Sequence, residues 1–281
     1  MLRSSNQLVL VTGGTGRQGG ATIQHLLANQ RVRVRVLTRN PHSAKAKRLA
    51  AQGVELVRGN FDDTATVAAA LSGVYAAFSV QCDGALELQR GRAFADAVMA
   101  AGTPYLVYSS LDGAERKSGV PHYESKWHIE QYIRDLGLTA TILRPVAFME
   151  NFSTAAFPRS ILLGLLRAAL GRSQRLQLVS TSDIGWFAAR ALEEPGHYAG
   201  RTIALAGDEL NVEEILDAYR LVFGRAPRSI PIPCFMPRLL PKELSSMLRW
   251  FAEHGFQANI PALKQEHRDL MSFASWLRAV R

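Results

Sequence analysis

The sequence predicts an α/β protein whose core is a doubly wound parallel sheet, followed by a smaller, mostly helical C-terminal lobe. Short β-branched runs alternate with helical stretches through the first half of the chain. A glycine-rich turn joins the first strand to the first helix, and the alternation breaks after Asn151. Strands that alternate with helices imply right-handed crossovers, and therefore a parallel sheet with helices on both faces.

The N-terminal elements follow from hydrophobic periodicity and capping residues. Ser43 and Thr64 are candidate N-caps of two short helices. Valines alternate with arginines along residues 31–36, which predicts a strand towards a sheet edge with one poorly covered face. We expect strands at 8–11, 32–36, 54–57, 74–80, 105–109 and 139–143, and helices at 17–29, 43–52, 64–73, 86–101 and 123–136.

Beyond Asn151 only residues 202–206 have the pattern of a strand, and we expect this segment to return to the sheet. Asn211 with Glu214 three residues later has the spacing of a capping box. The expected domains are an α/β domain over 1–152 and a smaller lobe over 153–281, of which about 178–208 rejoins the sheet. Helical patterns occupy 153–170, 183–193, the stretch after Asn211, 234–254 and 262–280.

Composition and charge favour a soluble protein that takes a small ligand. The chain of 281 residues is 47% hydrophobic and carries a formal charge of +9, which is spread over both halves without a basic tail. Direct nucleic-acid binding is therefore disfavoured, while an anionic small ligand suits a diffuse positive charge. With neither a signal-peptide pattern nor an apolar stretch of bilayer length, we expect no membrane partner and a cytoplasmic location.

Two classes of site are disfavoured by the sequence. Cys82 and Cys234 lie far apart and have no metal-ligand spacing, and the seven histidines form no H-E-x-x-H pattern, so we expect no metal. No G-x-S-x-G motif supports a hydrolase.

The glycine turn is the strongest functional motif. Its spacing G-x-x-G-x-x-G permits a tight turn, a close approach to a pyrophosphate and close packing of helix on strand. N–H groups at the start of the following helix would face the anion. Because a strand precedes the turn and a helix follows it, we predict dinucleotide binding rather than a bare structural turn. The candidate contacts are Gly13, Thr15, Gly16, Arg17, Gln18 and Gly19.

Arg39 at the end of the second strand predicts NADP as the preferred cofactor, because arginine suits a 2′-phosphate where an acid would bind a 2′-hydroxyl. Arg17 and Lys45 can add to the same charge, although Arg39 can also merely solvate a strand end. Asn60, Phe61 and Asp62 follow the third strand and are candidates to read adenine. An ordinary turn before a helix explains these three residues almost as well.

Four spaced motifs together resemble the NmrA-like branch of the atypical short-chain dehydrogenase/reductases: VTGGTGRQGG, LTRNP, PHYESKWHIEQYI and TILRPVAFMENF. SDIGWFAARAL and GRTIALAGDELNVEEI extend the resemblance to about residue 216. The resemblance implies a Rossmann fold, NADP(H) bound mainly by the larger lobe, and a cleft between the lobes that can take a small-molecule ligand. It also implies that Pro145 and Phe148 approach the nicotinamide, although the aromatic and methionine residues of that segment can equally be ordinary core between the lobes. Some relatives are reductases of quinones or other unsaturated molecules, and others are cofactor-sensing regulators that bind a partner protein.

The resemblance fails at one catalytic position. Lys126 matches the lysine of the Tyr-x-x-x-Lys motif, but His122 stands where the tyrosine is expected and Tyr123 is one residue out of register. His122 can transfer a proton or can simply pack at the start of the helix. Ser110 matches the substrate-orienting serine, although serines also end strands for local reasons. We therefore expect a cofactor-responsive redox sensor that acts through a protein partner; the alternative is an NADPH-dependent reductase of a small electrophile such as a quinone.

Overall fold

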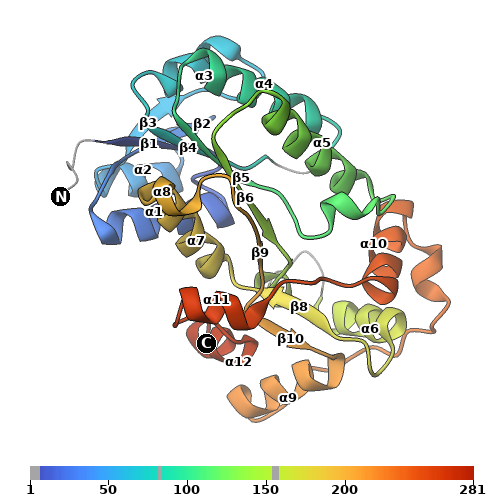
Figure 1. The fold of residues 1–281 in the computed structure, drawn as a ribbon. Helices are drawn as coiled ribbons and strands as arrows, with labels where there is room; N and C mark the ends of the chain where they lie inside the picture. Colours follow the sequence, from blue (N-terminus) through green and yellow to red (C-terminus); the bar gives the residue numbers. More distant parts are fainter. Residues whose placement is uncertain (1–6, 82–83, 154–157) are drawn as a thin grey trace. The chain divides into compact units, whose positions relative to one another are not determined.

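The computed structural model describes residues 7–81, 84–153 and 158–281, which form two compact units (Figure 1). The first unit consists of residues up to Ser110 together with Ser125–Arg144 and Ile184–Ile203. The second consists of Leu111–Glu124, Pro145–Asp183 and Ala204–Arg281. Cys82 lies outside the described residues, and Cys234 is an exposed free thiol.

A seven-stranded sheet in the order β3-β2-β1-β4-β5-β6-β9 dominates the first unit, as the alternation of elements predicts. Val9 of β1 pairs in parallel with Val34 on one side and with Ala76 on the other. The chain therefore winds outwards in both directions from β1, and the order reverses between β1 and β4, where ligands bind in open α/β sheets. The strands are β1 (Leu8–Val11), β2 (Arg33–Thr38), β3 (Glu55–Arg58), β4 (Ala76–Ser79), β5 (Tyr105–Ser109), β6 (Ala140–Pro145) and β9 (Thr202–Leu205).

Helices cover both faces of this sheet. In Figure 1, α3, α4 and α5 lie on one face and α1, α2, α7 and α8 on the other. The helices are α1 (Arg17–Asn29), α2 (Ala44–Ala51), α3 (Thr64–Leu71), α4 (Glu87–Ala100), α5 (Pro121–Asp135), α7 (Thr181–Glu193) and α8 (Pro195–Tyr198).

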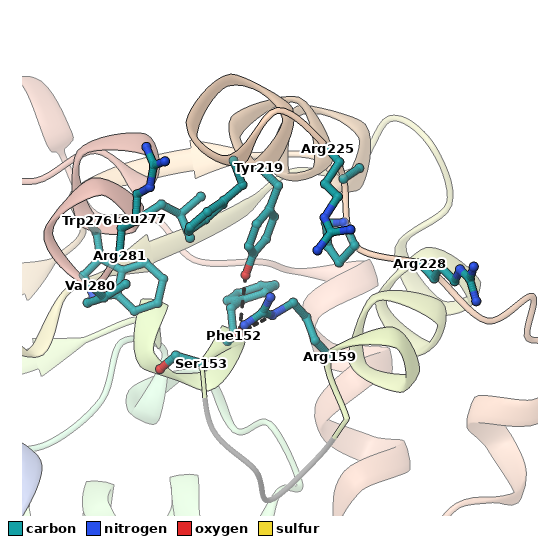
Figure 2. Close-up of a pocket in the computed structure, with 13 residues that line it drawn as sticks. Phe152, Ser153, Arg159, Tyr219, Arg225, Arg228, Trp276, Leu277, Val280 and Arg281 are labelled. Atoms are coloured by element: carbon teal, nitrogen blue, oxygen red, sulfur yellow. Dashed lines mark hydrogen bonds between the residues drawn. The ribbon is translucent and has the colours of Figure 1, made fainter.

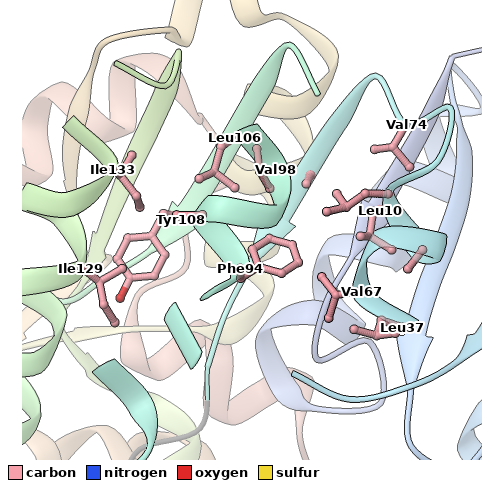
Figure 3. Packing of buried hydrophobic residues seen from close by; sticks show 14 of the residues in the cluster. Leu10, Leu37, Val67, Val74, Phe94, Val98, Leu106, Tyr108, Ile129 and Ile133 are labelled. Atoms are coloured by element: carbon pink, nitrogen blue, oxygen red, sulfur yellow. The ribbon is translucent and has the colours of Figure 1, made fainter. Parts of the chain in front are cut away.

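The hydrophobic core on one face of the sheet joins strands to helices (Figure 3). Leu10 and Tyr108 from the sheet are fully buried, and Phe94 of α4 and Ile129 of α5 pack in the same cluster. A Cβ on Gly91 of α4 would lie 2.4 Å from the Cδ1 of Ile129, so only glycine permits these two helices to approach this closely. This packing fixes the strands and helices relative to one another, and it therefore also fixes the turns that join the end of each strand to the next helix.

The second unit contains a small sheet that the sequence pattern does not reveal. Its order is β10-β8-β7, whereas only one strand, corresponding to β9, is expected after Asn151. That expectation is wrong because β8 and β10 become strands by pairing with each other across about 30 residues, and local spacing does not reveal such a pairing. The strands are β7 (Ala147–Phe148), β8 (Leu176–Val179) and β10 (Asp208–Leu210).

The helices of the second unit are shorter than the periodicity predicts. The pattern at 234–254 is divided by Pro241, and the pattern at 262–280 is interrupted between residues 267 and 272. Helix α6 begins at Arg159, and residues 154–157 of the predicted helix lie outside the described part of the chain. The elements are η1 (Ala114–Arg116), η2 (Met149–Phe152), α6 (Arg159–Leu170), α9 (Val212–Phe223), η3 (Met236–Leu239), α10 (Lys242–Glu253), α11 (Ile260–Glu266) and α12 (Phe273–Ala279).

Two of the three predicted N-caps are confirmed. Ser43 accepts a hydrogen bond from Ala46 N, and Asn211 forms the full capping box with Glu214. The third prediction is wrong by one residue, because Asp63 rather than Thr64 caps α3 and accepts from the N–H groups of residues 65 and 66. A carboxylate is the better cap because it also complements the positive end of the helix. In the described part of the chain, none of the helices is long and apolar enough to cross a membrane.

Candidate functional site

The glycine turn lies where the sheet order reverses. Gly13 has a φ of +62°, and a Cβ at this position would lie 2.8 Å from Val80 Cγ1 at the end of β4. A Cβ on Gly19 would lie 2.5 Å from Gly13 O, so the first turn of α1 rests directly on the end of β1. Both glycines are therefore required by close approaches within the turn.

Helix α1 begins at this turn without a side-chain cap. Its N-cap is Gly16, whose own N–H donates to Gly13 O at 2.8 Å. The next N–H groups of the helix point away from its body at the positive end of the helix dipole. A glycine turn and an uncapped helix start can together bind a phosphate group.

Cationic side chains surround the turn. Lys45 Nζ donates to Thr15 O at 3.2 Å, so α2 is tied to the glycine turn. Arg39 follows β2 and is exposed, as is Arg17 at the start of α1. Gln18 instead faces inward, where its Oε1 accepts from Ser109 Oγ at 2.6 Å. The charge around this end of the sheet is therefore suited to a second anionic group.

The three candidate adenine contacts are already engaged in local structure. Asn60 Oδ1 accepts from Asp62 N at 2.7 Å, and the Phe61 ring packs edge-on against Phe94 at 5.6 Å between centroids. The Asp62 carboxylate accepts two hydrogen bonds from Arg90, at 2.8 and 2.7 Å. Those bonds hold the pKa of Asp62 below its usual value, with a smaller contribution from the charge of Arg39.

Gln81 is a candidate contact that the sequence analysis missed. It follows β4, is only 4% exposed and donates through Nε2 to Ser79 Oγ at 2.7 Å. Its Oε1 has no hydrogen-bond donor among the described residues, and a buried unpaired acceptor is unfavourable by about 1–3 kcal/mol. The available signal was a polar residue directly after a buried strand at the ligand-binding edge of the sheet.

Ser110 belongs to a buried ion-pair network. Its Oγ donates to Glu130 Oε1 at 2.5 Å, and Glu130 is fully buried. Arg144 donates to both oxygens of the same carboxylate, at 2.9 and 2.7 Å, and Arg134 adds a third cationic contact at 2.9 Å. The Ser110 hydroxyl is therefore committed to balancing a buried charge.

Lys126 also has a protein partner. Its Nζ lies 2.8 Å from Glu87 Oε1 on α4, and the two side chains are 8% and 0% exposed. Ser125 Oγ donates to the other oxygen of this carboxylate. An ammonium group has three donors, so Lys126 can still donate to a ligand while Glu87 holds it in place.

His122 and Tyr123 are each held within the second unit. His122 Nδ1 lies 2.8 Å from Glu243 Oε1 of α10. The Tyr123 ring is 3% exposed and packs edge-on against Trp250 at 5.0 Å between centroids. Burial raises the pKa of Tyr123, and the nearby Asp112 carboxylate raises it further. Tyr123 is thus built into an aromatic core.

The remaining predicted residues lie in different settings. Pro145 is buried at the end of β6, and Phe148 is half-buried at the end of β7. Within residues 7–81, 84–153 and 158–281, side chains of histidine, cysteine, aspartate and glutamate form no cluster that could hold a metal ion.

The fold and the glycine turn define a Rossmann-type protein whose first helix starts without a side-chain cap at the switch point of the sheet. The model of the NmrA-like family matches residues 5–277, and the chain belongs to that family.

Similarity to individual proteins agrees with this assignment. The chain is 31% identical over 257 residues to the NmrA-like family domain-containing oxidoreductase malD of Malbranchea aurantiaca, covering 81% of this chain and 76% of the relative. It is 30% identical over 206 residues to quinone oxidoreductase 2 of Escherichia coli strain K12, covering 72% and 69%. The structure of NmrA, a negative transcriptional regulator, in complex with NADP superimposes with a TM-score of 0.80 at 20% identity, covering 99% and 96%.

Proposed function

We propose that this protein binds NADP(H) through its first unit and works as a cofactor-responsive redox sensor that acts through a protein partner. The glycine turn and the uncapped start of α1 would bind the pyrophosphate. Arg39, with Arg17 and Lys45, would hold the 2′-phosphate, because no acid stands at the end of β2 to prefer a free ribose hydroxyl. The NmrA structure in complex with NADP supports this assignment by similarity of fold.

Two buried groups would complete the cofactor site. Gln81 Oε1 receives no hydrogen bond from the described residues, and it would accept a hydrogen bond from the ligand. Lys126 would donate to the nicotinamide ribose from its fixed position on Glu87. The nicotinamide ring, when bound, supplies or accepts a hydride; the protein would bind and orient it.

One observation carries the choice of a sensor over a dehydrogenase. The phenol of the usual motif is replaced by His122, and the neighbouring Tyr123 is buried with a raised pKa. The Ser110 hydroxyl is bound to Glu130. The groups that would move a proton to a carbonyl are thus absent or engaged in structural contacts.

A reductase of a small electrophile is the second candidate. A quinone takes a hydride from NADPH and a proton from water to give the hydroquinone, so this chemistry does not need a tyrosine acid. The similarity to quinone oxidoreductase 2 of Escherichia coli favours this alternative.

The deciding experiment combines cofactor binding with turnover. NADP(H) affinity and NADPH oxidation over a panel of quinones, aldehydes and imines are measured for the wild type, His122→Ala and Lys126→Ala. A sensor is expected to show weak or absent turnover in all three proteins, with affinity kept in His122→Ala and lowered in Lys126→Ala. Capture of a partner protein should also differ between NADPH and NADP⁺.

The reductase predicts a different result. Efficient reduction of a panel member by the wild type would contradict the sensor. If His122 is the proton donor, its removal should lower the rate by about 10²–10⁴ and abolish a limb of the pH profile near neutrality. Failure of the wild type to bind NADP(H) would overturn both proposals.

A further inference from the structure

A cavity of about 830 Å³ lies entirely within the second unit (Figure 2). It opens between the end of α9, the segment that follows α9, the start of α6 and the C-terminal helix α12. Its volume is in the range of about 300–1,000 Å³ that holds a small organic molecule. None of the residues predicted from the sequence to bind cofactor or to act in catalysis lines it.

One wall of the cavity is aromatic. Tyr219 is 2% exposed and stacks on Phe223, with 5.9 Å between ring centroids and 28° between the ring planes. The Tyr219 hydroxyl donates to Phe152 O at 3.3 Å, which fixes the ring in place. Phe223 is 39% exposed, so part of its apolar surface is available to a ligand.

The rim of the cavity is cationic. Arg159, Arg225 and Arg228 line it, and none of the described lining residues has a carboxylate side chain. Arg159 Nε donates to Phe152 O at 2.7 Å and its guanidinium group lies 5.0 Å from the centroid of the Tyr219 ring. Guanidinium has five N–H donors, so this fixed arginine retains donors for a further partner. In Figure 2, Arg159 lies below the Tyr219 ring, Arg225 lies beside the ring and Arg228 lies farther out.

Two arginines near the cavity in the same unit are paired with acids. Arg167 of α6 pairs with Glu213 of α9 at 2.5 Å, and Arg175 pairs with Glu214 at 2.9 Å. Arg225 and Arg228 have no ion pair with a described residue, although they share a cavity with Arg159. The Tyr219 phenol is neutral at pH 7 and adds no negative charge, and burial raises its pKa to about 12. The arginines thus leave an unbalanced positive field over an aromatic wall.

We propose that this cavity binds a small aromatic carboxylate, with the carboxylate on the guanidinium groups of Arg159 and Arg225 and the aromatic ring against Phe223. Arginine matches the planar geometry of a carboxylate, and a stacked aromatic wall favours a flat apolar body. This site is independent of the NADP(H) proposal, since it uses residues of the second unit alone.

The test uses 2-naphthoate as the probe and isothermal titration calorimetry on the full chain. The wild type should bind 2-naphthoate at least about tenfold more tightly than the neutral 2-naphthamide, because charge-assisted hydrogen bonds are lost with the amide. The double variant Arg225→Gln/Arg228→Gln removes one of the two proposed carboxylate contacts together with a neighbouring charge of the rim, and should weaken the binding of 2-naphthoate by about tenfold. The matched control Arg172→Gln/Arg268→Gln removes two exposed arginines of the same unit that do not line the cavity, and should bind as the wild type does.

A second variant tests the aromatic wall. Phe223→Ala should weaken 2-naphthoate severalfold, and circular dichroism checks that each variant is folded. Saturating NADPH should leave the affinity for 2-naphthoate unchanged. No binding by the wild type, equal loss in the two double variants, equal affinity for naphthamide, or displacement by NADPH would each overturn the proposal.

Discussion

Two buried carboxylates in the first unit are each balanced by a named cation. Glu130 and Glu87 are both essentially inaccessible to solvent, and their carboxylates are held by Arg144 and Lys126. If one partner of such a pair is removed, the other charge stays buried without a counter-charge, and its desolvation lowers the stability of the fold. Side chains that look catalytic from their position in the sequence therefore also carry part of the stability of the fold.

Ser110→Ala should lower the free energy of unfolding by about 1.5–3 kcal/mol, because a hydrogen bond to the buried Glu130 carboxylate is lost. NADP(H) affinity should change little. Urea denaturation measures the first effect and fluorescence titration the second. The control is Ser72→Ala, whose side chain is exposed and should shift stability by less than about 0.5 kcal/mol. An unchanged stability with lost turnover would instead give Ser110 a chemical role.

Glu193 makes stability depend on pH. Burial raises the pKa of Glu193, against a weaker opposing effect of the hydrogen bond from Asn29. The folded state thus favours the protonated form more than the unfolded state does, so this contribution to stability is present below the unfolded pKa and is lost as pH rises through the folded one.

Glu193→Gln should therefore be more stable than the wild type at pH 7, by up to about 1 kcal/mol, and the advantage should shrink as the pH falls towards 4.5. Urea midpoints across this pH range measure the difference. Glu253→Gln, at an exposed position, serves as the control. An advantage that grows on acidification would contradict a raised pKa of Glu193 in the folded state.

At the scale of elements, the junction of β1 with α1 forms the turn that we propose binds the pyrophosphate. A tight turn, a positive φ at Gly13 and the direct seating of α1 on the strand all lie within seven residues, Gly13 to Gly19. Such a junction tolerates no added side-chain atom where backbone meets backbone.

Gly19→Ala should destabilise the protein by about 1–3 kcal/mol and weaken NADPH by at least about tenfold, since the new Cβ would lie 2.5 and 2.6 Å from the carbonyl oxygens of Gly13 and Thr12. Gly20→Ala is the matched control on the same helix. Its Cβ would meet Gly14 O only at 3.4 Å, and alanine should gain up to about 1 kcal/mol of helix propensity. Equal effects of the two substitutions on denaturation and NADPH titration would refute this account of the turn.

For the whole molecule, the charge of +9 and the site at the switch point favour an anionic dinucleotide over a neutral ligand. A ligand that binds only the folded state stabilises that state. At a ligand concentration of 100 times Kd, the free energy of unfolding rises by about 2.7 kcal/mol. Thermal stability is thus a measure of cofactor choice that does not depend on turnover.

NADPH should raise the melting temperature more than NADH at equal concentration, because only NADPH offers a 2′-phosphate to Arg39. Arg39→Ala should weaken the affinity for NADPH by about 10- to 100-fold and leave the affinity for NADH nearly unchanged. Differential scanning fluorimetry measures both effects, with the exposed Arg278→Ala as control. Equal losses for the two cofactors would refute the role of Arg39.

The sequence by itself determined the seven-stranded sheet and its glycine turn, and with them the family. These features depend on local spacing: β-branched runs, helical periodicity and glycines at positions 13, 16 and 19 are all readable within a few residues. The capping box at Asn211 was predictable for the same reason.

Only the tertiary structure decided what the polar side chains do. Glu87 and Lys126 are 39 positions apart, and no local pattern reveals that their side chains meet at 2.8 Å. The segments of β8 and β10 become strands because they pair with each other, and that pairing joins residues about 30 positions apart. The arginines of the cavity come from the start of α6, the segment after α9 and the residues after α12. Contacts between distant segments depend on packing, which sequence periodicity does not encode.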